Sequence, residues 1–307
     1  MTTQRDMTEQ DLTTGSGVTP QRTAGDVLDL ITTHDGDVET VAFECLAGGL
    51  TDARVASLMH VLGWSDDVRC FAVAGFAPTV GGGATGGFGG DAVMHTLARL
   101  RTTAHDLGGS LVIAGTHEGI CVVLTASRAA ATPEVTCTAM MGVFDADRPV
   151  ALGPERHGVH GASATIRAAL ATLAAAPAIR ESRAAQGAGR PTSVARQELN
   201  RLVRAEDALP ERALLGDEDA KRELIDAVYG SLAAGGADDP TLETVSTFVL
   251  SGGSLETTAK ALNVHPNTVR YRLKRAADTT GWDATDPREA YVLRTAIALG
   301  RIAAARS

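Results

Sequence analysis

A run of basic, amide and hydroxyl side chains lies near the C-terminal end of this 307-residue chain. Residues 265–275 include four Lys or Arg residues, no Asp or Glu, and an asparagine, a threonine and a tyrosine among the cations. Long cations bind phosphate oxygens, and amide and hydroxyl groups form hydrogen bonds with base edges in the major groove. This combination indicates recognition of double-stranded DNA.

These side chains divide between two sides of one helix, at about 100° per residue. Val269, Leu273 and Ala276 repeat at i, i+4 and i+7 and form an apolar face. The opposite face and its two shoulders, where Arg270 and Arg272 fall, point away from that face. They supply the residues that we expect to contact DNA, which are His265, Asn267, Thr268, Arg270, Tyr271, Arg272, Lys274 and Arg275.

A preceding helix and a tight turn must position this basic helix. Ser254 follows two glycines and is a suitable N-cap for the first helix, in which Ala259 is small enough for close helix packing. Asn263 tolerates the left-handed conformation that a tight turn requires, and Pro266 suits the first position of the next helix. Two short helices joined in this way predict a helix-turn-helix.

Other interpretations of these residues stay open at the level of the sequence. The basic helix could be a solvated helix of an ordinary α-helical bundle. His265 could cap the helix instead of touching phosphate or base, and Tyr271 could pack against a second copy of the chain. The capped turn, the proline start and the polar face together favour DNA binding.

The C-terminal third resembles a known DNA-binding domain. The segments ALPERALLGDEDAKRELIDAVYGSL, HPNTVRYRL and DPREAYVLRTAIALGR, with Gly281 between the last two, are similar to the C-terminal domain of the PucR/CdaR family of bacterial transcription regulators. That domain is a helix-turn-helix similar to that of the nucleoid protein Fis. The resemblance runs from about residue 208 to 302, and it is weaker over residues 50–180.

The resemblance implies a function and a partner. It implies a sequence-specific regulator of a metabolic operon that binds double-stranded DNA as a homodimer or higher oligomer, with an effector that the sequence does not identify. The Ala-, Gly- and Arg-rich composition and the ALPERALLGD segment are most similar to actinobacterial regulators of fatty-acid biosynthesis genes.

The middle of the chain predicts an α+β domain with a mostly antiparallel sheet that helices cover on one face. Strand-length apolar runs occupy residues 68–76, 110–115, 120–125 and 135–144, with a short edge strand expected at 151–153. Helical patterns occupy residues 91–107 and 161–175. Residues 116–119 form a four-residue hairpin loop between the second and third runs.

The hairpin resembles the corresponding part of the degenerate GGDEF-like domain found in the same family. Active diguanylate cyclases carry several carboxylates there, whereas this chain has Gly115-Thr116-His117-Glu118-Gly119 and a single carboxylate. One carboxylate cannot organise the two-metal site that phosphodiester formation requires. We therefore expect no catalytic residue, metal or cofactor. The alternatives are a nucleotide-binding or cyclase-type enzyme with an accessory helix-turn-helix, and an interaction adaptor that does not bind DNA.

Three further patterns are weaker candidates for sites. The glycine-rich residues 81–90 could approach a phosphate, but they match neither phosphate-binding fingerprint, and a loop is favoured. His157 and His160 resemble a ligand pair without a third ligand nearby. Ser163 does not stand in a nucleophile elbow.

Charge and composition agree with a cytoplasmic DNA-binding protein. The net charge is −9, but residues 254–307 hold nine Lys or Arg against five Asp or Glu, so the rest of the chain carries −13. The four cysteines stand in apolar runs without CxxC pairing and predict buried free thiols. No apolar run approaches the length of about 18 residues that a membrane span needs, and the first ten residues lack a signal-peptide core.

These patterns divide the chain into five expected parts. They are a disordered tail (1–24), a helical lead-in (25–65), the GGDEF-like α+β domain (66–180), a linker with helices (181–235) and the all-α helix-turn-helix domain (236–307). Because the region before the α+β domain is short, we expect no full N-terminal sensory domain.

Overall fold

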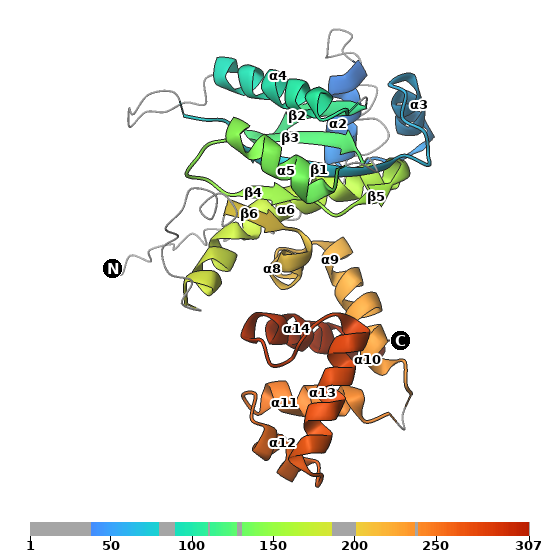
Figure 1. Cartoon of the computed structure of the whole chain (residues 1–307). Coiled ribbons are helices and arrows are strands. Elements are labelled where there is room, and N and C mark those ends of the chain that lie inside the picture. Colours follow the sequence, from blue (N-terminus) through green and yellow to red (C-terminus); the bar gives the residue numbers. More distant parts are fainter. Residues whose placement is uncertain are drawn as a thin grey trace, which may run out of the picture.

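The computed structural model describes residues 38–79, 90–109, 111–127, 131–185, 201–236 and 239–306. It contains an α+β domain and a helical domain that includes the C-terminal helices (Figure 1). The tail expected at residues 1–24 and most of the glycine-rich stretch, residues 81–89, lie outside the described residues, as do residues 186–200 of the expected linker. The fold class predicted from the sequence is confirmed.

The α+β domain is built on a mostly antiparallel sheet with the strand order β2-β3-β1-β4-β6. The strands are β1 (Arg69–Phe76), β2 (Val112–His117), β3 (Ile120–Ala126), β4 (Val150–Leu152), β5 (Arg156–His157) and β6 (Leu202–Arg204). β1 pairs antiparallel with β3, β4 and β5, and only β4 and β6 pair in parallel among the described strands. β4 is therefore an interior strand, not the edge strand expected at 151–153, because β6 from the expected linker pairs with its outer side.

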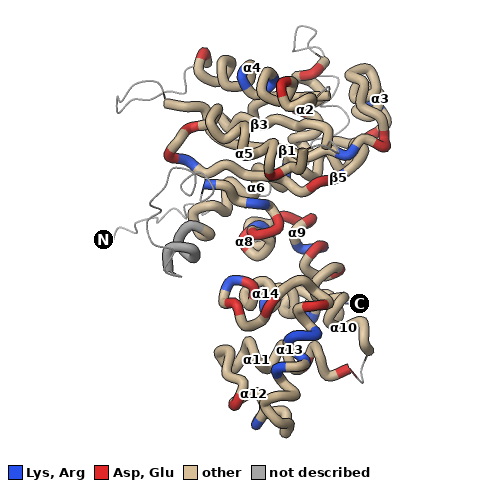
Figure 2. Tube along the Cα trace, in the orientation of Figure 1, with Lys and Arg blue, Asp and Glu red and all other residues tan. Residues whose placement is uncertain are grey.

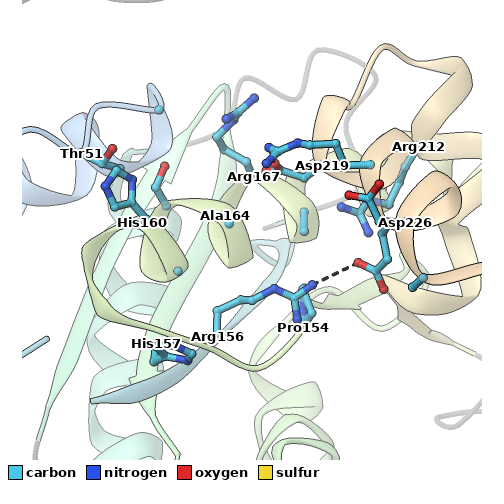
Figure 3. Close-up of a pocket in the computed structure, with 17 residues that line it drawn as sticks. Thr51, Pro154, Arg156, His157, His160, Ala164, Arg167, Arg212, Asp219 and Asp226 are labelled. Carbon is cyan, nitrogen blue, oxygen red and sulfur yellow. Dashed lines mark hydrogen bonds and ion pairs between the residues drawn. The ribbon is translucent and has the colours of Figure 1, made fainter. Parts of the chain in front are cut away.

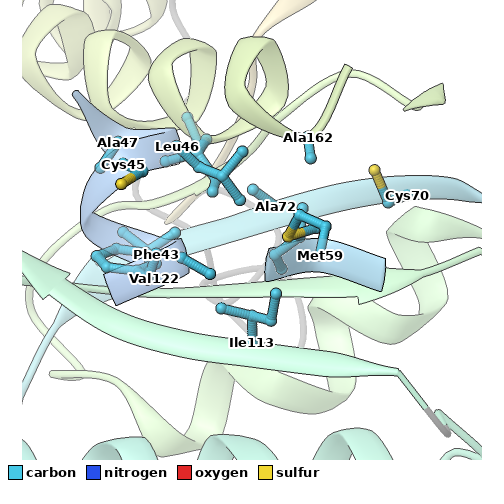
Figure 4. Packing of buried hydrophobic residues seen from close by; sticks show 14 of the residues in the cluster. Phe43, Cys45, Leu46, Ala47, Met59, Cys70, Ala72, Ile113, Val122 and Ala162 are labelled. Carbon is cyan, nitrogen blue, oxygen red and sulfur yellow. The ribbon is translucent and has the colours of Figure 1, made fainter. Parts of the chain in front are cut away.

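Helices cover both faces of this sheet, which corrects the expectation of one covered face. The helices α2 (Val38–Ala47), α3 (Ala53–Val61) and α6 (Gly158–Ala185) pack on one face, and Figure 4 shows Phe43 and Met59 over Ile113 and Val122. The helices α4 (Gly90–Asp106) and α5 (Pro133–Met140) pack on the other.

The sequence of β1 explains why both faces are covered. Ala72 belongs to the apolar core on one face and Val73 to the core on the other. A half-exposed strand alternates apolar and polar residues, whereas a strand buried on both faces is apolar throughout. The run RCFAVAGF is of the second kind.

Residues 135–144 form a helix, not the strand that their apolar character suggested. Thr132 Oγ1 accepts a hydrogen bond from the backbone N–H of Val135 (3.4 Å), and Pro133 occupies the first helical turn of α5. A 3₁₀ turn, η1 (Met141–Val143), follows directly. The Thr-Pro pair is a helix start signal, and it outweighs the strand-like composition.

The hairpin between β2 and β3 has a two-residue turn instead of the expected four-residue loop. Glu118 has φ of 49° and Gly119 has φ of 79°. Two successive positive φ angles give the tight turn whose twist matches that of antiparallel strands. The strands therefore extend as far as the pair His117 and Ile120.

The helical domain has one apolar core. Its elements are α8 (Leu209–Leu214), α9 (Glu218–Glu223), the π-helical segment η3 (Leu224–Tyr229), α10 (Gly230–Ala233), α11 (Thr241–Leu250), α12 (Leu255–Ala261), α13 (Pro266–Thr280) and α14 (Pro287–Ala304). The core joins Leu209 of α8 and Leu224 of η3 to Leu273 of α13 and Leu293 of α14. A short 3₁₀ turn, η2 (Glu206–Ala208), connects β6 to α8.

The short helix α8 lies at the junction of the two domains and carries two ion pairs. The Arg212 guanidinium is 2% exposed, bonds the Asp217 carboxylate at 2.8 Å and donates to the carbonyl of Ala205 beside β6 at 3.0 Å. The neighbouring Glu211 accepts two hydrogen bonds from Arg288 at the start of α14, at 2.5 and 2.6 Å. Adjacent residues of one short helix therefore contact both domains.

The cysteines are free and buried, as the sequence predicted. Burial raises the pKa of the Cys70 and Cys137 thiols to about 12 and that of Cys121 to about 11. Thiols with raised pKa values carry little thiolate at neutral pH and are poor nucleophiles.

One helix is longer and more apolar than the sequence analysis expected. The 22 residues Gly158–Ile179 of α6 meet the length and hydropathy of a membrane span, although 61% of the most apolar window is buried inside the protein. Ile166 and Ala169 pack in the core beneath β1. This packing is that of a core helix.

Leu273→Ala tests the core of the helical domain. Leu273 is 3% exposed, and its truncation should lower the free energy of unfolding by about 2–5 kcal/mol because the lost packing leaves a cavity. Chemical denaturation of the full chain measures the change. The exposed neighbour Lys274→Ala is the control and should stay within about 0.5 kcal/mol of the parent.

Candidate nucleic-acid interface

The first helix of the pair, α12, begins after the cap that the sequence indicated and ends at Ala261, just before the turn at Asn263. Ser254 Oγ accepts a hydrogen bond from the N–H of Thr257 at 3.2 Å and caps the helix. Ala259 is buried where α12 meets α13, and Asn263 in the turn has φ of 52°. Asparagine is among the few residues that adopt this conformation at low cost, so it allows the sharp reversal between the helices.

The second helix, α13, starts with a histidine cap. His265 Nδ1 accepts a hydrogen bond from the backbone N–H of Asn267 at 3.1 Å, and Pro266 is the first helical residue. Because Nδ1 is an acceptor, a neutral imidazole carries its proton on Nε2. The exposed His265 therefore caps the helix and still has an N–H group that can bind an external oxygen.

One face of α13 docks on the rest of the helical domain. Val269, Leu273 and Ala276 are buried in the apolar core with Val245 and Phe248 of α11. The buried set is the one that the i, i+4, i+7 spacing predicted. Its burial determines which side chains of α13 face solvent.

The outward face of α13 carries amide, phenol and cationic groups. Figure 2 shows Lys and Arg positions along α13. Asn267, Arg270, Tyr271 and Lys274 are all exposed, Tyr271 to 70%. Arg270 donates a hydrogen bond to Asn267 Oδ1 at 2.8 Å. A bidentate contact of Asn267 with adenine needs both its oxygen and its nitrogen. Such a contact would release Arg270, which could then bind a phosphate.

Two of the expected DNA-contacting arginines bind α11 and the residues before it. Arg275 forms an ion pair with Asp239 at 2.8 Å, and the half-buried Arg272 donates to Thr244 Oγ1 at 3.3 Å. Hydrogen bonds from Thr241, followed by the charges of Arg275 and Arg272, hold the pKa of Asp239 below its usual range. Arg272 and Arg275 therefore lie at the side of the polar face, and Thr268 is half-buried at its edge.

Two residues of this surface were not assigned from the sequence as part of the interface. The carboxylate of Asp239 accepts a hydrogen bond from the N–H of Thr241 at the start of α11, and it also neutralises Arg275, which is 36 residues away in sequence. Lys260 is exposed near the end of α12 and adds a cation beside the turn. The sequence alone could have indicated Lys260, because it is a basic residue in the last turn of the first helix. It could not have indicated the Asp239–Arg275 ion pair, because that pair joins distant segments.

The weaker candidates that the structure describes form neither a nucleophile elbow nor a metal site. Ser163 is buried and donates its hydroxyl to the carbonyl of Leu46 at 2.7 Å. His157 and His160 line a cleft between the domains. Across the described residues, His, Cys, Asp and Glu side chains form no group of three or more that could hold a metal ion.

Comparisons with known proteins agree with this geometry. Residues 241–299 match the family model described as PucR C-terminal helix-turn-helix domain, and residues 47–175 match the GGDEF-like domain. Uncharacterised proteins of Mycobacterium bovis and Mycobacterium tuberculosis are 32% identical over 271 residues, which are 88% of this chain. The chain spans 59% of the length of these curated relatives.

A solved structure is similar along almost its whole length. The crystal structure of a regulator of polyketide synthase expression from Bifidobacterium adolescentis has 48% sequence identity and a TM-score of 0.74. The similarity covers 90% of this chain and 98% of that chain. Both domains of the present chain therefore have counterparts in a protein named as a regulator.

Two substitutions at His265 distinguish a role in capping α13 from a role in contacting DNA. His265→Ala removes the cap and should lower the free energy of unfolding by about 1 kcal/mol, whereas His265→Asn replaces the Nδ1 acceptor with a side-chain oxygen acceptor and should cost less. Denaturation curves of both variants measure this difference. If Nε2–H also contacts DNA, both variants lose DNA affinity by a similar factor. Full affinity in His265→Asn would show that the histidine only caps.

Proposed function

We propose a specific mode of action for this chain, which belongs to the PucR family of transcription regulators and is itself a DNA-binding regulator. In this proposal α13 enters the major groove of an operator, and two chains bind across a dyad. The GGDEF-like domain has no catalytic role and serves assembly or sensing. The protein acts in the cytoplasm.

The exposed polar face of α13 is the observation that supports this proposal. Its buried face is fixed by the core, so Asn267 and Tyr271 face outward on a rigid helix. Side chains on a rigid helix can match the donors and acceptors of base edges. We assign base recognition to Asn267, Thr268 and Tyr271. Phosphate binding is assigned to the Nε2–H group of His265 and to the flanking cations Arg270, Arg272, Lys274 and Arg275.

The size of one module supports a dimer. α13 has 15 residues, and its exposed amide and phenol groups, Asn267 and Tyr271, lie in the first two turns. One helix of this kind contacts a few base pairs, and a single module buries too little surface for tight specific binding. Two copies spaced by about one turn of DNA, roughly 34 Å, would double the contacts.

The regulated genes are proposed from the family resemblance and from the named role of the similar solved protein. That protein is described as a regulator of polyketide synthase expression. Polyketide and fatty-acid synthesis both extend acyl chains by condensation of acyl units. We therefore propose that this chain controls genes for acyl-chain synthesis, with fatty-acid biosynthesis as the first target to test.

Base and phosphate contacts differ in their response to salt. Asn267→Ala or Tyr271→Ala should relax base preference and cost roughly 1–3 kcal/mol of binding free energy. Arg270→Ala or Arg272→Ala should weaken binding to all sequences and reduce the salt slope by about one each. Fluorescence anisotropy on specific and scrambled duplexes at several salt concentrations measures both effects.

Arg99→Ala is the matched control for the arginine variants, because Arg99 is exposed on α4 in the other domain. Its affinity and salt slope should equal those of the parent. An Asn267→Ala variant with unchanged affinity and footprint would remove α13 from the groove.

The dyad predicts the stoichiometry of the complex. Analytical ultracentrifugation of the full chain with a footprinted operator should show two chains, or an even number, per duplex. Halving the operator at its centre should weaken binding by at least about a hundredfold, because the second module's contacts are lost. One chain per full operator with unchanged affinity would exclude the dyad.

A further inference from the structure

A cleft of about 830 Å³ lies between the α+β domain and the helices that lead to the DNA-binding domain. One wall is formed by the start of α6 and the residues before it, and the other by α8, α9 and η3 (Figure 3). Clefts of this volume at domain boundaries are common sites for small ligands.

The two walls differ in charge. The α6 wall contributes Arg156, His157, His160 and Arg167, and no acidic residue among the described residues of that wall lines the cleft. The opposite wall contributes three carboxylates and two arginines, which are Asp219, Glu223, Asp226, Arg212 and Arg222. The α6 wall is therefore the side on which an anion would bind.

Most of these charges already have partners. Arg156 reaches across the cleft and donates to Glu223 at 3.1 Å. On the other wall Arg212 is paired with Asp217, and Arg222 with Asp219. Among the Lys, Arg, Asp and Glu side chains of the cleft that the structure describes, Arg167 and Asp226 have no hydrogen bond or ion pair, and Arg167 is the cation of the two.

Arg167 is placed to receive a ligand. Its guanidinium lies against Gly49, where a Cβ atom would be 3.6 Å from Arg167 Nη1. His160 lies one helical repeat of seven residues before it, on the same wall. A guanidinium offers a planar set of N–H donors that matches two oxygens of a carboxylate or phosphate.

The opposite wall contacts the DNA-binding domain directly. The segment η3 is π-helical, a conformation that often marks functional sites. Tyr229 of η3 packs so closely on α14 that its ring leaves no room for a Cβ atom at Gly300. With the Glu211–Arg288 pair, this contact ties the wall to α14. A shift of the wall would therefore displace α14 and, through their shared core, α13.

We propose that this cleft binds a small oxyanion, a carboxylate or a phosphate, through Arg167 with His160, and that its occupation changes the affinity of α13 for DNA. A ligand there competes with the Arg156–Glu223 contact that bridges the walls. A ligand shifts a conformational equilibrium only when it binds one arrangement better. The link to DNA affinity rests on the proposed function, whereas anion binding does not.

Anion binding is tested on the full chain without DNA. Inorganic phosphate and succinate are titrated separately at constant ionic strength set with chloride, and the proton NMR signals of the histidine rings are followed. At least one anion should shift the His160 signal saturably, and Arg167→Ala should weaken binding by at least about tenfold. Binding of phosphate or of succinate shows whether the cleft prefers a phosphate or a carboxylate. Arg99→Ala should leave the binding curve unchanged, and Arg167→Lys should recover part of it.

The coupling is then tested with operator DNA. The saturating anion should change operator affinity in the parent and in Arg99→Ala, but not in Arg167→Ala. The absence of saturable binding by either anion, or equal binding in Arg167→Ala, would overturn the site. Binding with unchanged operator affinity would overturn the coupling alone. A chain that binds anion but no DNA would contradict the proposed function and leave the anion site standing.

Discussion

The docking of one face of α13 into the helical core is the constraint on which the DNA-binding surface depends. Val269 and Leu273 can be buried in only one rotation of the helix, and that rotation turns Asn267 and Tyr271 outward. Burial of each large apolar side chain is worth roughly 1.5–3 kcal/mol, which exceeds what a surface polar contact supplies. The apolar face therefore decides the orientation of the polar face.

Ion pairs and hydrogen bonds within the protein then occupy some of the cations on this surface. Arg275 is 57% exposed but paired with Asp239, and Arg270 is bound to Asn267 in the same helix. Free protein therefore satisfies some of its cations internally, and DNA must replace these contacts. Exposed pairs of this kind are weak, so the replacement costs little. An acidic body next to a basic helix also limits contacts with unrelated phosphates.

The arginine at the junction between the domains is buried, and its charge therefore needs partners. Arg212 is buried, and a buried charge is tolerated only with a partner and hydrogen bonds. Asp217 and the carbonyl of Ala205 supply them. The neighbouring Glu211 does the same for Arg288 on α14.

The sequence alone determined the features that depend on neighbours a few residues apart. Ser254, Asn263, Pro266 and the apolar repeat of α13 predicted the helix-turn-helix, because caps, turns and helix faces are local properties. Local patterns conflict at residues 135–144, where the apolar composition suggests a strand but Thr132-Pro133 is a helix start signal, and the residues form a helix.

Tertiary structure alone decided what joins distant segments. The parallel pairing of β6 with β4 and the Asp239–Arg275 pair both bring together residues from separate parts of the chain. The cleft around Arg167 has the same origin, since its walls come from α6 and from η3. No periodicity or spacing encodes these contacts, because they depend on how the elements pack.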